Sequence, residues 1–198
     1  MRKKKNHHFE TKVIHAGQKS DPTTGAVMTP IVLASTFEQS SPGVHKGYDY
    51  SRSINPTREA FENCIADLEN GYKGYGFSSG VAAISACVEL LSPGDHIIAM
   101  DDLYGGSVRL FNEIKSLSQG IEISYVDMTD TNNIKNAIKA STKMIFVETP
   151  TNPLLKIADL SKIAKLAKKE KILTVCDNTF ASPFNQKPIN DGIDIVIH

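Results

Sequence analysis

Four short loops carry the residues that could do chemistry, and each follows an apolar segment. The first, Phe77-Ser-Ser-Gly-Val-Ala-Ala83, has small residues that lead directly into an expected helix. Free backbone N–H groups at a helix start, together with the positive end of the helix dipole, suit a phosphate group. A tight strand-to-helix turn also arises for structural reasons alone, so this motif is weak by itself.

The second loop, Asp101-Asp-Leu-Tyr-Gly-Gly-Ser107, places Tyr104 before two flexible glycines. An aromatic ring at this position could stack on a flat cofactor, which typically contributes about 0.5–1.5 kcal/mol beyond simple burial. The alternative is a loop tyrosine that packs at the rim of the domain.

The third and fourth loops, Glu148-Thr-Pro-Thr-Asn-Pro153 and Cys176-Asp-Asn-Thr-Phe180, supply an amide at Asn152 and a carboxylate at Asp177. A rigid proline turn is the structural explanation of the first. An acid so close to a buried strand must find a partner or be costly, and Asp177 could cap the next turn instead of facing a ligand.

A mostly parallel sheet would bring these loops together. Apolar, β-branched runs predict strands that alternate with amphipathic helices. The expected strands are 74–77, 96–100, 121–126, 143–148, 172–176 and 193–197, and the expected helices are 80–91, 106–118, 131–140 and 159–170. Ligands of open α/β sheets bind beyond the carboxyl ends of the strands. The four loops therefore predict one pocket with a phosphate cup, a stacking ring, an amide and a buried carboxylate, which suits a pyridine cofactor with a phosphate tail.

The first quarter of the chain is different in character. Residues 1–56 are rich in Gly, Pro, Ser and Thr and predict an extended arm, while residues 57–198 predict the α/β domain. A helix is expected to begin near Asn55-Pro-Thr57, with Thr57 as its cap, and to end at Gly71. An arm of this composition needs another surface to lie on.

Bulk composition excludes several classes of protein. Lys plus Arg and Asp plus Glu both total 22 in 198 residues, which argues against nucleic-acid or anionic-membrane partners. The three scattered cysteines favour a reducing compartment, and we expect the cytoplasm. The basic start, Met1 to His8, leads into no apolar run, and His7-His8 fits a frayed polar terminus better than a metal site. A dinucleotide-binding domain is disfavoured because the GxGxxG fingerprint is missing.

With these motifs in hand, the sequence resembles the Cys/Met-metabolism family of fold-type I pyridoxal-phosphate (PLP) enzymes. The resemblance covers nearly the whole chain. It implies an α/β fold, the PLP-binding large domain with helices on both faces of the sheet, cut before a C-terminal domain. The motifs that carry it are Ile14-His-Ala-Gly17, Gly25-Ala-Val-Met-Thr-Pro-Ile31, Tyr48-Asp-Tyr-Ser-Arg-Ser-Ile-Asn-Pro-Thr-Arg58, Ser78-Ser-Gly-Val-Ala-Ala83, Leu103-Tyr-Gly-Gly106, Glu148-Thr-Pro-Thr-Asn-Pro153 and Asp177-Asn-Thr-Phe180.

The resemblance also implies roles at the phosphate and ring of the cofactor. Ser79 and the backbone amides of Gly80 and Val81 would hold the phosphate, and Val81 replaces the Met or Leu more usual there. Tyr104 would stack on the ring and is a candidate for proton transfer. Asn152 would hydrogen-bond the ring hydroxyl oxygen.

Further implied roles concern the ring nitrogen and a neighbouring subunit. Asp177 would pair with the pyridine nitrogen and favour its protonated form, with Thr179 as support. Tyr50 and Arg52 would reach the phosphate of an adjacent subunit, because a guanidinium fork matches phosphate oxygens. The resemblance thus implies a homo-oligomer, a tetramer built from dimers that share active sites.

The implied activity is that of a PLP-dependent carbon–sulfur lyase or transferase acting on small amino acids. Tyr104-Gly-Gly106 lacks the cysteine typical of methionine γ-lyases, and the form of the 48–58 motif argues against cystathionine β-lyases. Cystathionine γ-synthase and γ-lyase remain, which form or cleave a C–S bond at a γ-carbon. The cofactor lysine is expected a few residues beyond His198, so the 198 residues alone are predicted to be inactive; a noncatalytic partner or remnant is the alternative.

Overall fold

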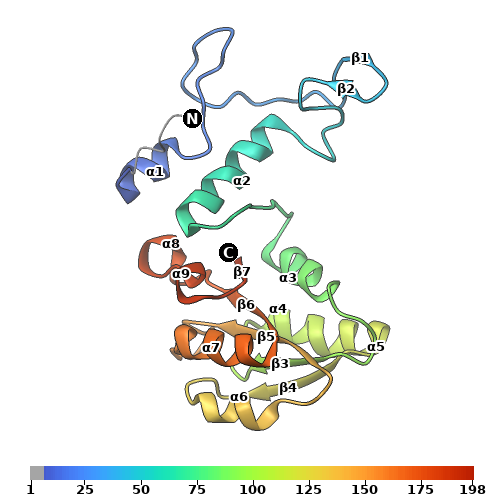
Figure 1. The fold of residues 1–198 in the computed structure, drawn as a ribbon, viewed down its shortest axis with the longest axis vertical. Helices are drawn as coiled ribbons and strands as arrows, with labels where there is room; N and C mark the ends of the chain where they lie inside the picture. Colours follow the sequence, from blue (N-terminus) through green and yellow to red (C-terminus); the bar gives the residue numbers. More distant parts are fainter. Residues whose placement is uncertain (1–6) are drawn as a thin grey trace. The chain divides into compact units, whose positions relative to one another are not determined.

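The chain forms two compact units that divide between Gly76 and Phe77. A computed structural model describes residues 7–198, so the basic start at residues 1–6 lies outside the described residues. In Figure 1 the first unit runs from blue to teal and the second from green to red. The expected boundary between arm and α/β domain, at residue 56, stays a prediction.

The first unit has little regular structure before its long helix. It contains α1 (Phe9–His15), the short hairpin of β1 (Gln39–Ser41) and β2 (Val44–His45), and α2 (Pro56–Glu69). None of residues 7–65 is buried. The segment before α2 therefore has no core of its own.

Helix α2 begins with a different cap from the one expected. The side chain of Asn55, not Thr57, accepts the N–H groups of Thr57 at 2.9 Å and Arg58 at 3.4 Å. Thr57 instead bonds the arm, since its hydroxyl donates to the Pro30 carbonyl at 2.8 Å. The helix ends at Glu69, two residues before Gly71, because its cap Asn70 adopts the left-handed conformation that asparagine tolerates, with φ 58°.

The expected strand at residues 74–77 is absent, and this prediction was wrong. The segment lies as an irregular stretch against α2, where a Cβ at Gly74 would come within 2.3 Å of the Glu62 carbonyl oxygen. The N–H of Gly76 donates to the Glu62 side chain at 2.8 Å. Alternating glycines here allow close packing on a helix rather than pairing in a sheet.

The second unit is built on a five-stranded parallel sheet in the order β4-β3-β5-β6-β7, so the carboxyl ends of all five strands meet at one edge. The predicted, mostly parallel sheet is confirmed. The strands are β3 (His96–Met100), β4 (Glu122–Val126), β5 (Thr142–Glu148), β6 (Leu173–Asp177) and β7 (Ile195–Ile197).

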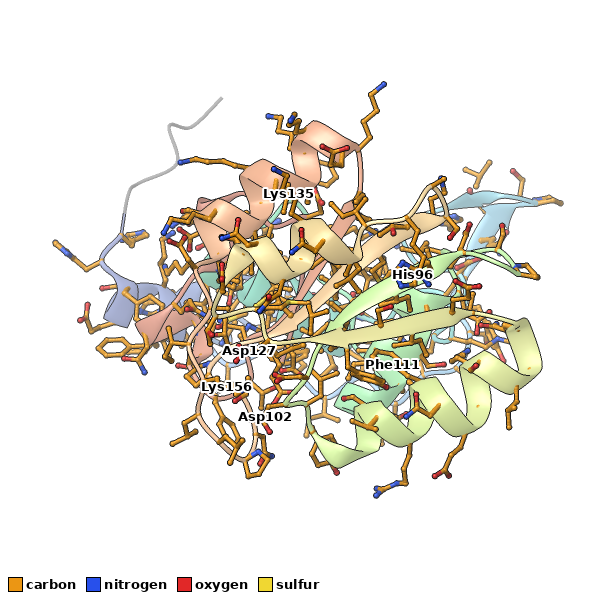
Figure 2. The ribbon with its side chains drawn as sticks, turned by 90° about the horizontal axis from the view of Figure 1, so that it is seen from below. His96, Asp102, Phe111, Asp127, Lys135 and Lys156 are labelled. Carbon is orange, nitrogen blue, oxygen red and sulfur yellow. The ribbon has the colours of Figure 1, made fainter. Side chains whose placement is uncertain are left out.

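Helices cover both faces of this sheet. In Figure 2 the yellow-green helix formed by α4, η1 and α5 lies on one side of the strands, and α6 and α7 lie on the other. The T-shaped contact of Phe111 and Phe146, with centroids 5.2 Å apart, joins the first of these helices to β5. The helices of this unit are α3 (Gly80–Val88), α4 (Gly105–Arg109), the π-helix η1 (Leu110–Lys115), α5 (Ser116–Gln119), α6 (Thr131–Ala137), α7 (Leu160–Glu170), α8 (Ser182–Asn185) and α9 (Pro188–Asp191).

A buried histidine joins three strands at the amino end of the sheet. The two ring nitrogens of His96 lie 2.8 Å from the Thr142 hydroxyl and 2.9 Å from the Ser124 hydroxyl. Burial lowers the pKa of His96, so the ring is held in its neutral form. Figure 2 shows His96 toward the opposite end of the strands from Asp102 and Lys156, so its role is structural.

We predict that Gly74→Ala destabilises the protein, while Gly71→Ala does not. The methyl group at position 74 would collide with the Glu62 backbone at 2.3 Å, whereas at position 71 the nearest atom, the Ala66 carbonyl oxygen, is 3.6 Å away. The expected loss for Gly74→Ala is about 1–3 kcal/mol. Denaturant unfolding of the complete gene product measures it, and equal stabilities of the two variants would contradict the packing described.

Candidate active site

A cavity of about 360 Å³ opens where β5 and β6 end and α3 begins. Its volume lies in the usual range of small-molecule sites, roughly 300–1,000 Å³. Every site residue predicted for the second unit lines it, namely Ser79, Gly80, Val81, Tyr104, Asn152, Asp177 and Thr179. The remaining lining residues are Ile84, Glu148, Pro150, Phe180 and His198.

The start of α3 offers two backbone donors to this cavity. The Ser79 hydroxyl oxygen caps the helix by accepting the Ala82 N–H at 3.1 Å, and the Ser79 carbonyl accepts the Ala83 N–H. No acceptor in the described part of the chain bonds the N–H groups of Gly80 and Val81. Both N–H groups therefore remain available to an anion at the positive end of the helix.

Tyr104 stands at the rim of the cavity with a half-exposed ring. Its N–H donates to Glu148 Oε2 at 3.0 Å. A Cβ at Gly106 would lie 2.4 Å from Cε1 of the ring, so only glycine allows the ring its present position. The second glycine of this loop thus sets where the tyrosine ring can lie.

Asp177 ends β6 and is 8% exposed. Its Oδ1 accepts both the N–H of Thr179 at 3.0 Å and the Thr179 hydroxyl at 2.6 Å. No donor among residues 7–198 contacts Oδ2. The sequence left open whether Asp177 caps its own turn or faces a ligand. In the structure, Oδ1 caps the turn through Thr179, and Oδ2 remains available to a ligand.

Glu148 is a lining residue to which the sequence analysis gave no role. It ends β5 directly opposite Asp177 and is 5% exposed. Its Oε1 accepts the Asn152 N–H at 2.7 Å, and its Oε2 accepts the Tyr104 N–H. Burial raises the pKa of Glu148 to about 7, the charge of Asp177 adds to the rise, and the two N–H bonds oppose it. The sequence did offer a signal for Glu148. Like Asp177 at the end of β6, it is an acid that directly follows an apolar run, residues 144–147.

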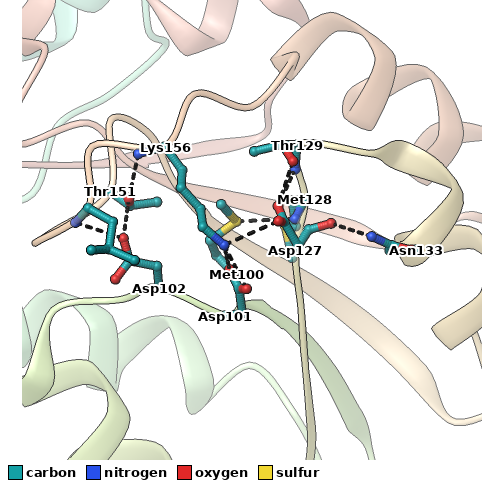
Figure 3. A network of polar contacts seen from close by, with 10 residues as sticks. Met100, Asp101, Asp102, Asp127, Met128, Thr129, Asn133, Thr151 and Lys156 are labelled. Atoms are coloured by element: carbon teal, nitrogen blue, oxygen red, sulfur yellow. Dashed lines mark hydrogen bonds and ion pairs between the residues drawn. The ribbon is translucent and has the colours of Figure 1, made fainter.

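Behind the cavity, a polar network ties three loops together (Figure 3). Lys156 Nζ lies 2.8 Å from Asp101 Oδ2 and 3.2 Å from Asp127 Oδ2. Asp102 accepts the Thr151 hydroxyl and, at 3.0 Å, the Leu154 N–H. The loops after β3, β4 and β5 are thus joined, which holds the turn that carries Asn152; Figure 2 places Asp102, Asp127 and Lys156 near one another.

Tyr50 and Arg52 belong to the first unit. The guanidinium carbon of Arg52 lies 5.1 Å from the centroid of the Tyr50 ring, a cation–π contact. Their expected reach to the phosphate of another subunit concerns a second chain and stays a prediction.

Residues 7–198 offer neither a metal site nor a membrane-spanning helix. No group of three or more His, Cys, Asp or Glu side chains there could hold a metal ion, and this range includes His7 and His8. In the same range, no helix combines the length and the apolar character needed to cross a membrane.

Comparison with known proteins identifies the family. The family model for Cys/Met metabolism PLP-dependent enzymes matches residues 10–198. The chain belongs to this family. Its cofactor is accordingly pyridoxal phosphate.

Individual relatives carry three different activities in their names. A cystathionine beta-lyase of Coxiella burnetii is 58% identical over 98% of this chain and 50% of its own length. A probable cystathionine gamma-synthase of Herpetosiphon aurantiacus is 46% identical over 96% of this chain and 59% of its own length. The crystal structure of a Lactobacillus plantarum cystathionine gamma-lyase complexed with L-serine matches with a TM-score of 0.93 and 49% identity, covering 96% of this chain and 49% of that one.

These matches confirm the predicted fold class, the PLP-binding large domain of fold-type I enzymes. The chain spans about half the length of the first curated relatives it matches. The trans-sulfuration family is established, and the three names leave the individual reaction open.

The groups present in the cavity fit PLP. The unbonded N–H groups of Gly80 and Val81 are complementary to a phosphate. The half-exposed ring of Tyr104 suits a flat heterocycle, and Oδ2 of Asp177 suits a protonated nitrogen. Among the described residues, no lysine or arginine lines the cavity, and a cationic ring nitrogen would suit the acidic groups there.

We predict that Gly106→Ala weakens PLP binding by displacing the Tyr104 ring, while Gly105→Ala does not. At position 105 the nearest atom to a new methyl group, an Arg109 guanidinium nitrogen, is 3.7 Å away. Loss of ring stacking should raise the Kd for PLP about 2- to 12-fold. Equilibrium dialysis of the complete gene product measures the Kd, and equal values for the two variants would refute the role given to the ring.

Proposed function

We propose that the protein is a PLP-dependent trans-sulfuration enzyme that forms or cleaves a C–S bond at the γ-carbon of homoserine- or cystathionine-type amino acids. The observation that carries the proposal is the buried Asp177 carboxyl, which keeps one oxygen without a donor among residues 7–198, in a cavity that fits PLP. Membership of the Cys/Met metabolism family supports it.

At the phosphate and ring faces, this chain would act mainly by binding. The N–H groups of Gly80 and Val81, beside Ser79, would hold the phosphate. Tyr104 would stack on the ring, and its hydroxyl would move a proton to or from the substrate. The amide of Asn152 would donate to the ring hydroxyl oxygen, held in place by the Glu148 bond to its N–H.

Asp177 would supply the electrostatic part of the mechanism. When bound, PLP supplies an electron sink for negative charge that develops on the α-carbon of the substrate. The carboxylate of Asp177 favours a proton on the ring nitrogen, because an opposite charge nearby stabilises the cationic form. Thr179 occupies Oδ1 with two hydrogen bonds, which leaves Oδ2 for that nitrogen.

We further propose that the protein is a homo-oligomer, a tetramer built from dimers that share active sites, in which the arm lies on a second copy. Four large apolar side chains of the arm, at 72–90% exposure, favour a covering surface: Val27, Met28, Ile31 and Leu33. Tyr50 and Arg52 would then reach the phosphate site of the neighbouring subunit. The three free cysteines fit a reducing compartment, and we propose the cytoplasm.

A cystathionine β-lyase is the second candidate. Its support is the 58% identity to the Coxiella burnetii enzyme of that name, the highest value among the three relatives described. The sequence argument against β-lyases, which used the motif at residues 48–58, gains no support from this match.

Product analysis of the complete gene product separates these reactions. With uptake of water, cleavage of cystathionine at the γ-carbon gives cysteine, 2-oxobutyrate and ammonia, whereas cleavage at the β-carbon gives homocysteine, pyruvate and ammonia. A γ-synthase would instead join an activated homoserine to cysteine and release the activating group with the γ-oxygen. Failure of all three reactions with PLP bound would contradict the proposal and favour a noncatalytic protein.

We predict that Asp177→Asn lowers kcat on the order of 10²-fold or more, a loss comparable to removal of a preorganised electrostatic group in other enzymes. Asparagine keeps the size of the side chain but removes the charge that favours the ring proton. Thr179→Val removes the hydroxyl donor to Oδ1 and should cause a smaller loss, while Thr179→Ser keeps the hydroxyl and should stay close to wild type. Steady-state kinetics measures all three, and an Asp177→Asn variant of wild-type activity would overturn the assignment.

A further inference from the structure

Glu148 joins the two loops that carry Tyr104 and Asn152. Oε2 accepts the N–H of Tyr104 at 3.0 Å and Oε1 accepts the N–H of Asn152 at 2.7 Å. One loop follows β3 and the other follows β5, and the two N–H groups are 48 residues apart in sequence, from 104 to 152. Glu148 therefore joins the two loops at the very residues that line the cavity, in addition to the bonds that Asp102 makes to Thr151 and Leu154.

Only a carboxylate can do this with one side chain. The amide of glutamine has one acceptor oxygen, and its nitrogen would meet the second N–H as another donor. A shorter acid such as aspartate has both acceptors but lacks one methylene of reach. The bridge thus depends on the charge and on the length of Glu148.

The surroundings of Glu148 within this chain disfavour its charged form. The side chain is 5% exposed, and none of the salt bridges among the described residues includes it. The acids that face it are Asp177 at the end of β6 and Asp102 in the loop after β3, and both raise its pKa. A buried, unpaired carboxylate beside another acid is costly unless something in the site uses it.

We propose that Glu148 is a positioning residue. It strengthens cofactor binding without contacting the cofactor, because it holds the Tyr104 and Asn152 loops in one fixed arrangement. This inference rests on the proposed function, because it takes the cavity to be the PLP site. The negative charge of Glu148 also acts alongside Asp177 in favour of a cationic group in the cavity.

The test is Glu148→Gln in the complete gene product, with Glu113→Gln as the matched control. Glu113 undergoes the same chemical change on an exposed turn of η1. Loss of one hydrogen bond to the charged group should raise the Kd for PLP between about 10- and 100-fold in Glu148→Gln. Glu113→Gln should keep the wild-type Kd.

The pH dependence of PLP binding gives a readout that a purely structural residue would not change. The pKa of Glu148 is about 7, so protonation below that pH removes the second acceptor from the wild type as well. The ratio of the two Kd values, Glu148→Gln to wild type, should therefore shrink as the pH falls from about 8 to about 6. The other titratable groups are the same in both proteins: Asp177, His198 and Tyr104 line the cavity with Glu148, and the charge of Asp102 acts on Glu148 from the loop after β3.

Glu148→Asp keeps the experiment decisive if Glu148→Gln does not fold. Aspartate retains the charge but cannot span both N–H groups, so we expect its Kd for PLP to rise about tenfold or more. If PLP binds wild-type protein and both variants equally well, Glu148 is not a positioning residue and the proposed function still stands. If wild-type protein binds no PLP, the proposed function itself fails.

Discussion

Two buried acids end neighbouring parallel strands, and the pocket depends on how their charge is held. The register of β5 against β6 sets Glu148 directly opposite Asp177. Both are less than 10% exposed, and no lysine or arginine is among the described residues that line the cavity. Backbone N–H groups and Thr179 satisfy three of the four carboxyl oxygens. The fourth, Oδ2 of Asp177, is the position from which a cationic ring nitrogen would be held.

The parallel sheet explains why loops distant in sequence share this site. Because the carboxyl ends of its strands meet at one edge, the turns after β3, β5 and β6 converge there with α3. Convergence alone does not fix side chains to within a fraction of an ångström. The Lys156 network and the Asp102 bonds add that precision from behind, and Glu148 adds it from inside the cavity.

Much of this could be read from sequence, for definite physical reasons. Buried parallel strands are uniform apolar runs, so β3 to β6 were predicted to within about two residues. Three loops that follow strands, together with the loop that leads into α3, supplied seven lining residues. The cap at Asn55 was missed because the Thr57 hydroxyl binds the distant Pro30 carbonyl. The strand at 74–77 failed because glycines there serve close packing on α2. Glu148 closes an apolar run as Asp177 does, but its bridging role was missed because its partners are backbone groups, which have no sequence signature.

The groups that would bind the cofactor are not the groups that decide whether the β- or the γ-carbon reacts. Relatives named β-lyase, γ-lyase and γ-synthase all match this same segment at 46–58% identity. In the second unit, the groups with a proposed role would bind the phosphate, the ring hydroxyl, the ring faces and the ring nitrogen, and the electron sink that PLP supplies when bound would serve either reaction. Cleavage at the β- or the γ-carbon instead depends on where the substrate carboxylate and sulfur are held relative to the ring. The selection therefore lies with groups that contact the substrate, and the Asp177 charge serves each reaction alike.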